Sequence, residues 1–296
     1  MVKLLAISLK DMPSIVMSFM KPYICVIGIL LILQSPCCAQ ESKKNVFSID
    51  EAQALYRSAM TAKKNGNFLT SREYLIKIID HFPKYSKVEK VKNEWGKITF
   101  ILIHSDILSP ESVFYEVLPG DSLEKIAQKY CTTIELIKQR NSLKENNLEE
   151  GQELSIWKQP FSIIVDRGTN QLWLKENKNI VKQYRVSTGK VEAITPLGEF
   201  TIKYRYPFPT WYHRGEVVAG GRRDNLLGAR WLGFDKPKYG IHGTIYPQLI
   251  GQSVSGGCIR MKNEDVEELY DIVPVGTKVT IIDSQAKLKK EDIKNN

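Results

Sequence analysis

The sequence predicts a multidomain chain whose C-terminal part is mainly β, preceded by a compact β-α-α-β module and an α-helical segment. Three observations support this fold class. Apolar residues recur at helical spacing over residues 45–108. Two short strand patterns enclose two helix starts over residues 113–157. Residues 161–283 then read as short strands between turn signals, a pattern typical of an all-β sandwich or partly closed barrel.

The composition is that of a globular protein. The chain has 296 residues, 43% hydrophobic and 25% charged, which argues against wholesale disorder and against a fibrous repeat. The net charge of +9 suits an anionic polymer as partner. No block of Lys and Arg with interleaved aromatic residues stands out, so we do not expect nucleic-acid binding.

Residues 1–39 are predicted to be an export signal or an N-terminal anchor. The apolar run Tyr23–Leu33 is shorter than the roughly 20 residues of a spanning helix. It matches a signal-peptide core of about 7–15 residues, with cleavage after Ala39. An uncleaved anchor and lipid attachment at Cys37 or Cys38 are the alternatives. We therefore expect an exported protein of the periplasm or cell envelope, with membrane contact only through this segment.

The remaining cysteines do not indicate a disulfide framework. Beyond the N-terminal segment only Cys131 and Cys258 are present, in two different predicted domains. Cys131 falls at the end of a predicted helix, where we expect a small, buried and inert side chain.

Residues 45–108 are predicted to form three helices, which begin with capping patterns at Ser48, Thr70 and Ser86. The first two helices resemble a single tetratricopeptide-type hairpin, and the residues that carry this resemblance are Ala52, Leu55, Tyr56, Gly66, Leu75, Phe82 and Pro83. One such unit buries little by itself. The segment is either a helical spacer packed on its neighbour or a docking surface for a protein partner.

Residues 113–157 combine a strand, two helices and a return strand. Asp121 is expected to cap the first helix, and Thr132 to begin a capping box for the second. The module resembles a LysM domain through Tyr115, Val117, Gly120, Asp121, Ser122, Leu123, Ile126, Ala127, Asn141, Leu143, Gly151 and Leu154. The resemblance implies binding of N-acetylglucosamine-containing glycans such as peptidoglycan. By position, the implied glycan groove consists of Gly120, Asp121, Ser122, Leu123 and roughly residues 147–151.

The C-terminal domain is predicted over residues 161–283, followed by a charged tail over residues 284–296. The expected strands span residues 161–166, 171–175, 180–187, 199–204 and 278–282. Asn263 is expected to cap a helix that carries Glu264 and Asp265 at its positive end.

Two clusters in this domain carry the chemistry. One contains His242, and the other contains Cys258 directly after Gly256 and Gly257. A cysteine nucleophile needs a thiolate, and a neighbouring imidazole supplies it by taking the proton, with the thiol pKa drawn down to roughly 3.5–7.5. The glycines allow a tight turn and leave backbone N–H groups open to a developing oxyanion.

These clusters resemble the catalytic signature of L,D-transpeptidases. The signature residues are His242, Gly243, Thr244, Ser255, Gly257, Cys258 and Arg260. Supporting matches are Ser187–Gly189, Thr195–Phe200, Leu227–Trp231 and Gly276–Thr277. The resemblance implies the mainly-β transpeptidase fold over residues 161–283, preceded by the LysM module and the tetratricopeptide-like segment.

The resemblance also implies the role of each residue. Cys258 is the nucleophile and His242 the general base, oriented by a backbone carbonyl that the sequence does not locate. Arg260 and Ser255 shape the site, with Gly243 and Thr244 beside them, and the N–H groups of Gly257 and Cys258 are the oxyanion donors. Many members of the family have His where this chain has Gly256, which puts substrate positioning in question more than the chemistry.

The implied reaction is acyl transfer in two steps. The thiolate attacks the carbonyl of the third stem residue, usually meso-diaminopimelate, and D-alanine leaves. A stem amine then resolves the thioester and forms a 3-3 cross-link. Water as acceptor gives a carboxypeptidase, and a protein lysine gives an anchored lipoprotein. No cofactor is implied, and the Cys, His and acidic residues show no zinc spacing.

Two other functions are compatible with parts of the sequence. Cell-wall endopeptidases of the cysteine-peptidase type place Cys before His in the chain, whereas His242 precedes Cys258 here. A non-enzymatic scaffold would bind the wall through residues 113–157 and carry a degenerate catalytic domain. The intact Cys258 and His242 argue against the scaffold.

Overall fold

The structure, a computed structural model, describes residues 49–213 and 215–286. The predicted export signal, its cysteines and most of the charged tail lie outside these residues. No helix within the described ranges is long and apolar enough to cross a membrane.

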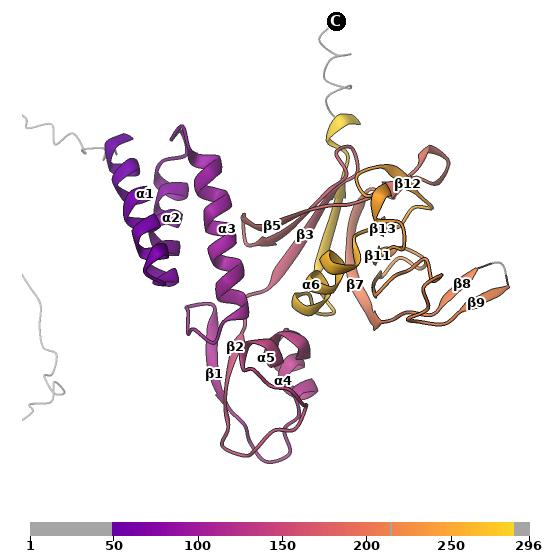
Figure 1. The fold of residues 1–296 in the computed structure, drawn as a ribbon, viewed down its shortest axis with the longest axis horizontal. Helices are drawn as coiled ribbons and strands as arrows, with labels where there is room; N and C mark the ends of the chain where they lie inside the picture. The colour runs from indigo at the N-terminus through magenta and orange to yellow at the C-terminus, as the bar shows by residue number, and fades with distance from the viewer. Residues whose placement is uncertain (1–48, 214, 287–296) are drawn as a thin grey trace, which may run out of the picture. The chain divides into compact units, whose positions relative to one another are not determined.

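Three helices begin the described chain: α1 (Ile49–Lys64), α2 (Phe68–His81) and α3 (Val88–His104) (Figure 1). Each buries one face, and α3 also packs against the catalytic sheet. The predicted start of the second helix at Thr70 is wrong, because α2 begins two residues earlier, after Asn67. Neither Asn67 before α2 nor Lys87 before α3 makes a side-chain cap, so packing rather than capping chemistry sets these helix starts.

The next module has the predicted β-α-α-β order: β1 (Ser112–Glu116), α4 (Leu123–Tyr130), α5 (Ile134–Arg140) and β2 (Glu153–Trp157). The two strands pair antiparallel along their whole length. Ser122 caps α4 and Thr133 caps α5, each through a side-chain oxygen that accepts a backbone N–H. The caps expected at Asp121 and Thr132 are therefore each one residue too early.

The expectation of a buried Cys131 is wrong. Cys131 ends α4 in the left-handed conformation at φ +50°, and its side chain is exposed. Cys131 is therefore the left-handed cap that ends α4, and not a core residue.

Two arginines, buried Arg140 and partly buried Arg72, connect these segments to each other and to the sheet. The Arg140 guanidinium, on α5, donates to the carbonyls of Leu102 and Ile103 at 2.7 Å each, at the C-terminal end of α3. Arg72, on α2, pairs with Glu176 on the catalytic sheet at 2.7 Å. A cation beside the last carbonyls of a helix satisfies groups that have no intrahelical partner.

The catalytic domain consists of short strands with one α-helix and two 3₁₀ turns. Its elements are β3 (Phe161–Asp166), β4 (Gln171–Glu176), β5 (Asn179–Arg185), β6 (Thr188–Gly189), η1 (Val191–Ala193), β7 (Gly198–Pro207), β8 (Trp211–His213), β9 (Glu216–Val218), β10 (Arg230–Phe234), β11 (Gly240–His242), η2 (Pro247–Leu249), β12 (Ser253–Ser255), β13 (Ile259–Arg260), α6 (Asn263–Ile272) and β14 (Lys278–Ile282).

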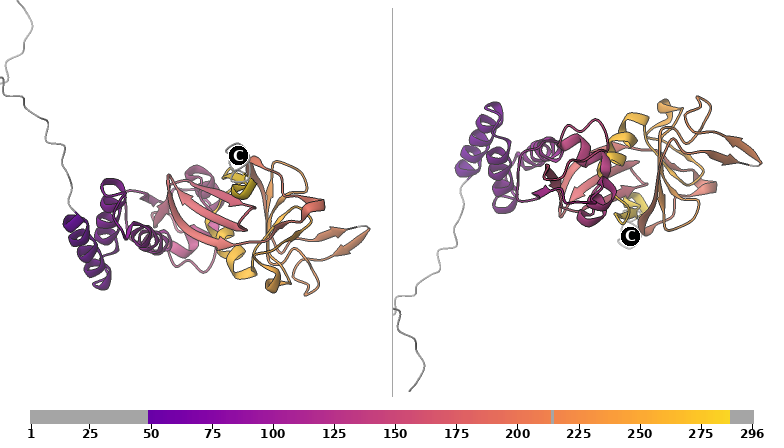
Figure 2. Two further views of the ribbon diagram at one scale, coloured as in Figure 1. Left: turned by 90° about the horizontal axis from the view of Figure 1, so that it is seen from above. Right: turned by 90° about the horizontal axis from the view of Figure 1, so that it is seen from below.

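Eight of these strands form one mixed sheet in the order β13-β11-β10-β7-β14-β3-β4-β5. The mainly β fold that the sequence predicts is confirmed. One long strand, β7, joins the two halves of the sheet, because β14 pairs with its first half and β10 with its second. The β8–β9 hairpin extends away from this sheet (Figure 2).

A register shift changes the direction of side chains along β7. Gly233 pairs with Tyr204, but the next residue, Phe234, pairs with Ile202, which leaves one extra residue in β7. Ile202 is fully buried, whereas Tyr204 and Tyr206 are about half exposed. The bulge therefore turns the two tyrosines onto the open face of the sheet.

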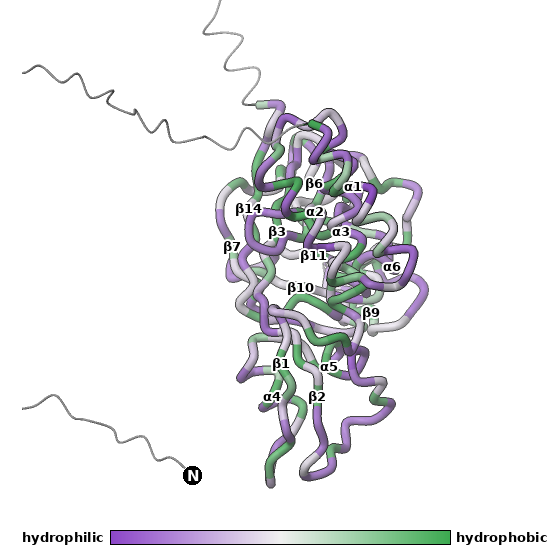
Figure 3. The backbone as a smooth tube through the Cα atoms, turned by 90° about the vertical axis from the view of Figure 1, so that its left-hand side faces the viewer, coloured by the Kyte–Doolittle hydropathy of each residue, from purple (hydrophilic) through white to green (hydrophobic). Residues whose placement is uncertain are grey.

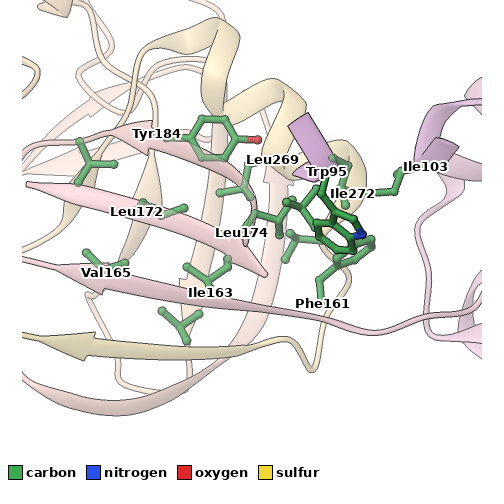
Figure 4. Close-up of a cluster of buried hydrophobic side chains, with 14 of the residues drawn as sticks. Trp95, Ile103, Phe161, Ile163, Val165, Leu172, Leu174, Tyr184, Leu269 and Ile272 are labelled. Carbon is green, nitrogen blue, oxygen red and sulfur yellow. The ribbon is translucent and has the colours of Figure 1, made fainter. Parts of the chain in front are cut away.

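The core lies between the sheet, α3 and α6 (Figure 4). Residues labelled there, including Trp95, Phe161, Leu174 and Leu269, belong to one buried cluster. Along the chain, hydrophobic and hydrophilic residues alternate within helices and strands instead of gathering in one apolar block (Figure 3). A smaller cluster fills the β-α-α-β module.

The expected capping role of Asn263 is wrong. The residue before α6 is Lys262, which makes no side-chain cap, and Asn263 is already the first helical residue. Its side chain reaches instead to the neighbouring loops, where it accepts backbone N–H groups from Ala229 and Thr244.

Candidate active site

Strand pairing places the predicted site residues on one face of the sheet. β11 and β13 run parallel, with Ile241 opposite Ile259 and His242 opposite Arg260. Side chains alternate between faces along a strand. Ile241 and Ile259 are both fully buried in the core. Cys258 lies directly before β13, and the charge of Arg260 acts on both His242 and Cys258, which places the three side chains in one site.

His242 is buried and held in one orientation. Its Nδ1 lies 2.7 Å from the carbonyl oxygen of Gly243, and its ring stacks on Trp231 with centroids 5.6 Å apart. A carbonyl only accepts, so Nδ1 carries the proton and Nε2 keeps its lone pair. Burial, with the nearby charge of Arg260, lowers the pKa of His242 to about 4. The imidazole is therefore neutral at pH 7 and can act as a base.

The Cys258 side chain is partly buried. Its Sγ donates to the carbonyl of Lys238 at 3.2 Å. Burial raises the pKa of Cys258, against opposing effects of the Gly240 N–H and Arg260. The expectation of a depressed thiol pKa is wrong for this arrangement. The resting pair is a neutral thiol and a neutral imidazole, because burial penalises both charged forms.

Ser255 closes the turn that carries Cys258. Its hydroxyl donates to the carbonyl of Cys258 at 2.6 Å and accepts the N–H of Gly257 at 3.1 Å. Gly257 is therefore not a free oxyanion donor, contrary to the expectation, because its N–H already has a partner. Gly257 has φ +111°, whereas a Cβ added at Gly256 would meet nothing within 4 Å. The position at which the family often has His is thus open to solvent.

Arg260 has an unused donor inside the site. Its backbone exchanges two hydrogen bonds with Ser187, which fixes the residue at the edge of the sheet. Its Nε is buried without a hydrogen-bond partner in the described part of the chain. A buried guanidinium N–H without a partner is energetically costly, so the described residues leave this part of the Arg260 guanidinium unsatisfied.

Comparison with known proteins identifies two domains in this chain. The L,D-transpeptidase catalytic domain matches residues 160–281, and the LysM domain matches residues 115–157. The L,D-transpeptidase YqjB of Bacillus subtilis is 40% identical over 147 residues, which are 44% of this chain and 82% of that protein. The L,D-transpeptidase YkuD of Bacillus licheniformis is 40% identical over 176 residues, which are 57% of this chain and 98% of that protein.

This chain belongs to the L,D-transpeptidase family. YkuD of Bacillus subtilis is also similar, with 39% identity over 173 residues, or 56% of this chain and 97% of that protein. The family has a cysteine acyltransferase as its catalytic domain, which is consistent with the placement of Cys258.

Gly243 and Thr244 support the transpeptidase site from the loop after β11. The Gly243 carbonyl orients the His242 ring, so it is the carbonyl that the sequence did not locate. Thr244 is buried, and its hydroxyl accepts the N–H of Tyr246 at 3.1 Å. Both residues therefore act through the shape of the loop rather than by facing the thiol.

Sequence reasoning missed an aromatic row in the transpeptidase domain. Tyr206 pairs with Trp231, and Trp231 pairs with His242, so the three side chains share the open face. The Trp231 indole lies over Gly233 and Gly240, where an added Cβ would come within 2.5 and 3.0 Å of it. The strand register needed to see this row depends on pairing between distant segments, for which the sequence carries no local signal.

The predicted glycan residues of the LysM domain have different environments. Leu123 is fully buried and contributes no side-chain surface. Asp121 accepts the Tyr115 hydroxyl at 2.6 Å and the Leu118 N–H at 2.9 Å, while Ser122 caps α4. Gly120 is exposed at φ +79°. The Asp121 and Ser122 side chains thus shape the loop, and the Gly120 carbonyl accepts a hydrogen bond from the Lys125 side chain.

Proposed function

We propose that this protein is an exported peptidoglycan L,D-transpeptidase that forms 3-3 cross-links with Cys258 as nucleophile. The observation that carries the proposal is the pairing of His242 with Arg260, two residues after Cys258, together with a neutral imidazole whose Nδ1 lies on the Gly243 carbonyl, so that Nε2 is the proposed proton acceptor. Exported location rests on residues 1–39, whose apolar run suits a signal peptide.

In the first half-reaction, the thiol of Cys258 leaves the Lys238 carbonyl and gives its proton to Nε2 of His242. The sulfur attacks the carbonyl carbon of the third stem residue, and the Cys258 N–H stabilises the oxyanion. The C–N bond to D-alanine then breaks, and the imidazolium returns the proton to the leaving amine. The product is a thioester on Cys258 and free D-alanine.

In the second half-reaction, the amine of a neighbouring stem attacks the thioester. His242 takes the excess proton of the amine, the C–S bond breaks, and the thiol is restored. Water as acceptor would give L,D-carboxypeptidase activity, and a lipoprotein lysine would give wall anchoring. Arg260 is proposed to bind a carboxylate or carbonyl of the donor stem through the part of its guanidinium that is not buried.

The LysM domain implies binding of peptidoglycan, and we propose that its exposed loop at Gly120 contacts the glycan strand through the backbone. The helical segment is proposed to be a tetratricopeptide-like hairpin, α1 and α2, attached to the spacer helix α3. Packing of α3 on the catalytic sheet favours the spacer role for that helix. A protein partner, if one exists, would meet α1 and α2.

Product analysis tests this proposal. Purified protein is incubated with disaccharide-tetrapeptide, and the muropeptides are identified by mass spectrometry. A 3-3 linked dimer with release of D-alanine is the expected result. Tripeptide alone would make the enzyme a carboxypeptidase. No change in the substrate, together with no acylation by a carbapenem, would favour the non-enzymatic scaffold.

A further inference from the structure

Asn263 stands at the start of α6 but directs its side chain to the loops beside the active site. Its Oδ1 accepts the N–H of Thr244 at 3.2 Å and the N–H of Ala229 at 3.1 Å. Two donors on one amide oxygen use both of its lone pairs. The side chain therefore fixes two loops at one point.

The first of these bonds reaches the base of the proposed reaction. The Thr244 N–H and the Gly243 C=O belong to the same peptide group, which is planar, with the two bonds pointing in opposite directions. The same Gly243 carbonyl oxygen lies 2.7 Å from Nδ1 of His242. Holding the N–H therefore fixes the direction of the carbonyl that orients the imidazole.

The backbone at two glycines lies so close to Asn263 Oδ1 that neither position has room for a side chain. A Cβ at Gly228 would lie 2.3 Å from Asn263 Oδ1, and a Cβ at Gly243 would lie 2.2 Å from it. Any side chain at either position would expel the amide. Both loops thus depend on glycine for the close approach that the two hydrogen bonds require.

We propose that Asn263 is a positioning residue for catalysis: through the Gly243–Thr244 peptide it holds His242 in the tautomer that keeps Nε2 free for the Cys258 proton. This inference rests on the proposed role of His242 as the base. The other interpretation is that Asn263 is only a structural tie between two loops and α6.

The test compares Asn263→Leu with Asn263→Asp in the full chain. Leucine removes the acceptor at similar size, whereas aspartate keeps Oδ1. Asn141→Leu is the matched control, because Asn141 also bonds only to backbone groups, through three hydrogen bonds in the LysM domain. Imidazole ¹⁵N NMR reports the tautomer, with the His242 signals assigned from the His242→Gln spectrum. Acylation by a carbapenem, corrected for the folded fraction, reports the chemistry.

We expect Asn263→Leu to lose the single Nδ1–H tautomer of His242 and to slow acylation by about 10–100-fold, the usual result of misplacing a catalytic group. Asn263→Asp should keep both the tautomer and the acylation rate. Asn141→Leu should lower only the free energy of unfolding. A leucine variant with the wild-type tautomer and rate would overturn the proposal, as would an aspartate variant as impaired as leucine.

If Asn263→Leu does not fold, Asn263→Ala takes its place with the same two readouts. Failure of the proposed function gives a different result. If His242 is not the base, His242→Gln will acylate at the wild-type rate, whatever the tautomer data show.

Discussion

At the scale of single residues, the site is a pair of groups that burial keeps uncharged. Burial lowers the pKa of His242 and raises the pKa of Cys258, so neither ion is favoured before substrate arrives. In the proposed reaction, the proton therefore moves as the sulfur attacks, and the thiol is not stored as a thiolate. An enclosed neutral thiol is also less open to oxidation than a resting thiolate.

This pairing predicts the pH dependence of acylation. The rate should be level from about pH 5 to 8, because His242 is already neutral there. It should fall as the pH drops through about 4, where the imidazole becomes protonated. It should rise at alkaline pH as thiolate forms. Stopped-flow acylation across this range checks the prediction, and a loss of rate centred near pH 6.5 would contradict it.

Burial of neutral His242 also predicts weaker folding in acid. Between pH 6.5 and about 4 the unfolded chain binds a proton at this residue and the folded chain does not, so the free energy of unfolding falls as the pH drops. The full effect is about 3 kcal/mol. His242→Gln should lose this part of the acid dependence in urea titrations. Burial also lowers the pKa of His104, which remains in the variant. An unchanged slope of the free energy of unfolding against pH would therefore assign the titration to His104.

At the scale of elements, the turn between β12 and β13 has two adjacent glycines with different constraints. Gly257 has φ +111°, and an added Cβ would lie 3.0 Å from the Tyr239 ring. Gly256 has neither restriction. Only the second glycine is thus required by the backbone.

The two glycines give a matched prediction. Gly257→Ala should lower the free energy of unfolding by more than about 1 kcal/mol, because alanine is strained at this φ. Gly256→Ala should change it by less than about 0.5 kcal/mol. Thermal unfolding of the two variants compares them directly. Equal losses would mean that the turn has a different conformation.

Strand and helix positions were largely predictable, whereas caps and register were not. The periodicity that predicts a strand at 161–166 is local, and β3 spans the same residues. Helix starts were displaced at Thr70, Asp121 and Thr132, because several neighbouring polar residues can each cap and packing decides among them. Asn263 was predicted to cap α6 for the same reason, whereas its side chain bonds to the neighbouring loops.

The motif around Cys258 and His242 could be found from sequence because its residues are chemically unusual together. That they lie in one site could not be predicted from sequence, since it depends on the parallel pairing of β11 with β13 across 15 residues of chain. The burial that raises the thiol pKa could not be predicted either, because it arises from the whole fold.

At the scale of the whole molecule, buried arginines join the segments. Arg140 is 2% exposed and donates to the last carbonyls of α3 and to Ser155, so α5 and the helical segment share one polar network. Burial lowers the pKa of Arg140 to about 10, which leaves the guanidinium charged at pH 7.

Arg140→Met should lower the free energy of unfolding by about 3 kcal/mol, because several buried carbonyls lose their donor. Lys138→Met, on the same helix and bonded only to the Asn146 side chain, is the control and should change little. Chemical denaturation followed by fluorescence measures both. A cost for Arg140→Met no larger than for the control would contradict the network.

The most direct measurement of the central claim is peptide mapping after acylation. The chain has two described thiols, exposed Cys131 and partly buried Cys258, so each is a control for the other. Wild-type protein treated with a carbapenem should carry one acyl group, on the peptide containing Cys258, and Cys258→Ala should carry none. Acylation at Cys131, or of the alanine variant, would contradict the account.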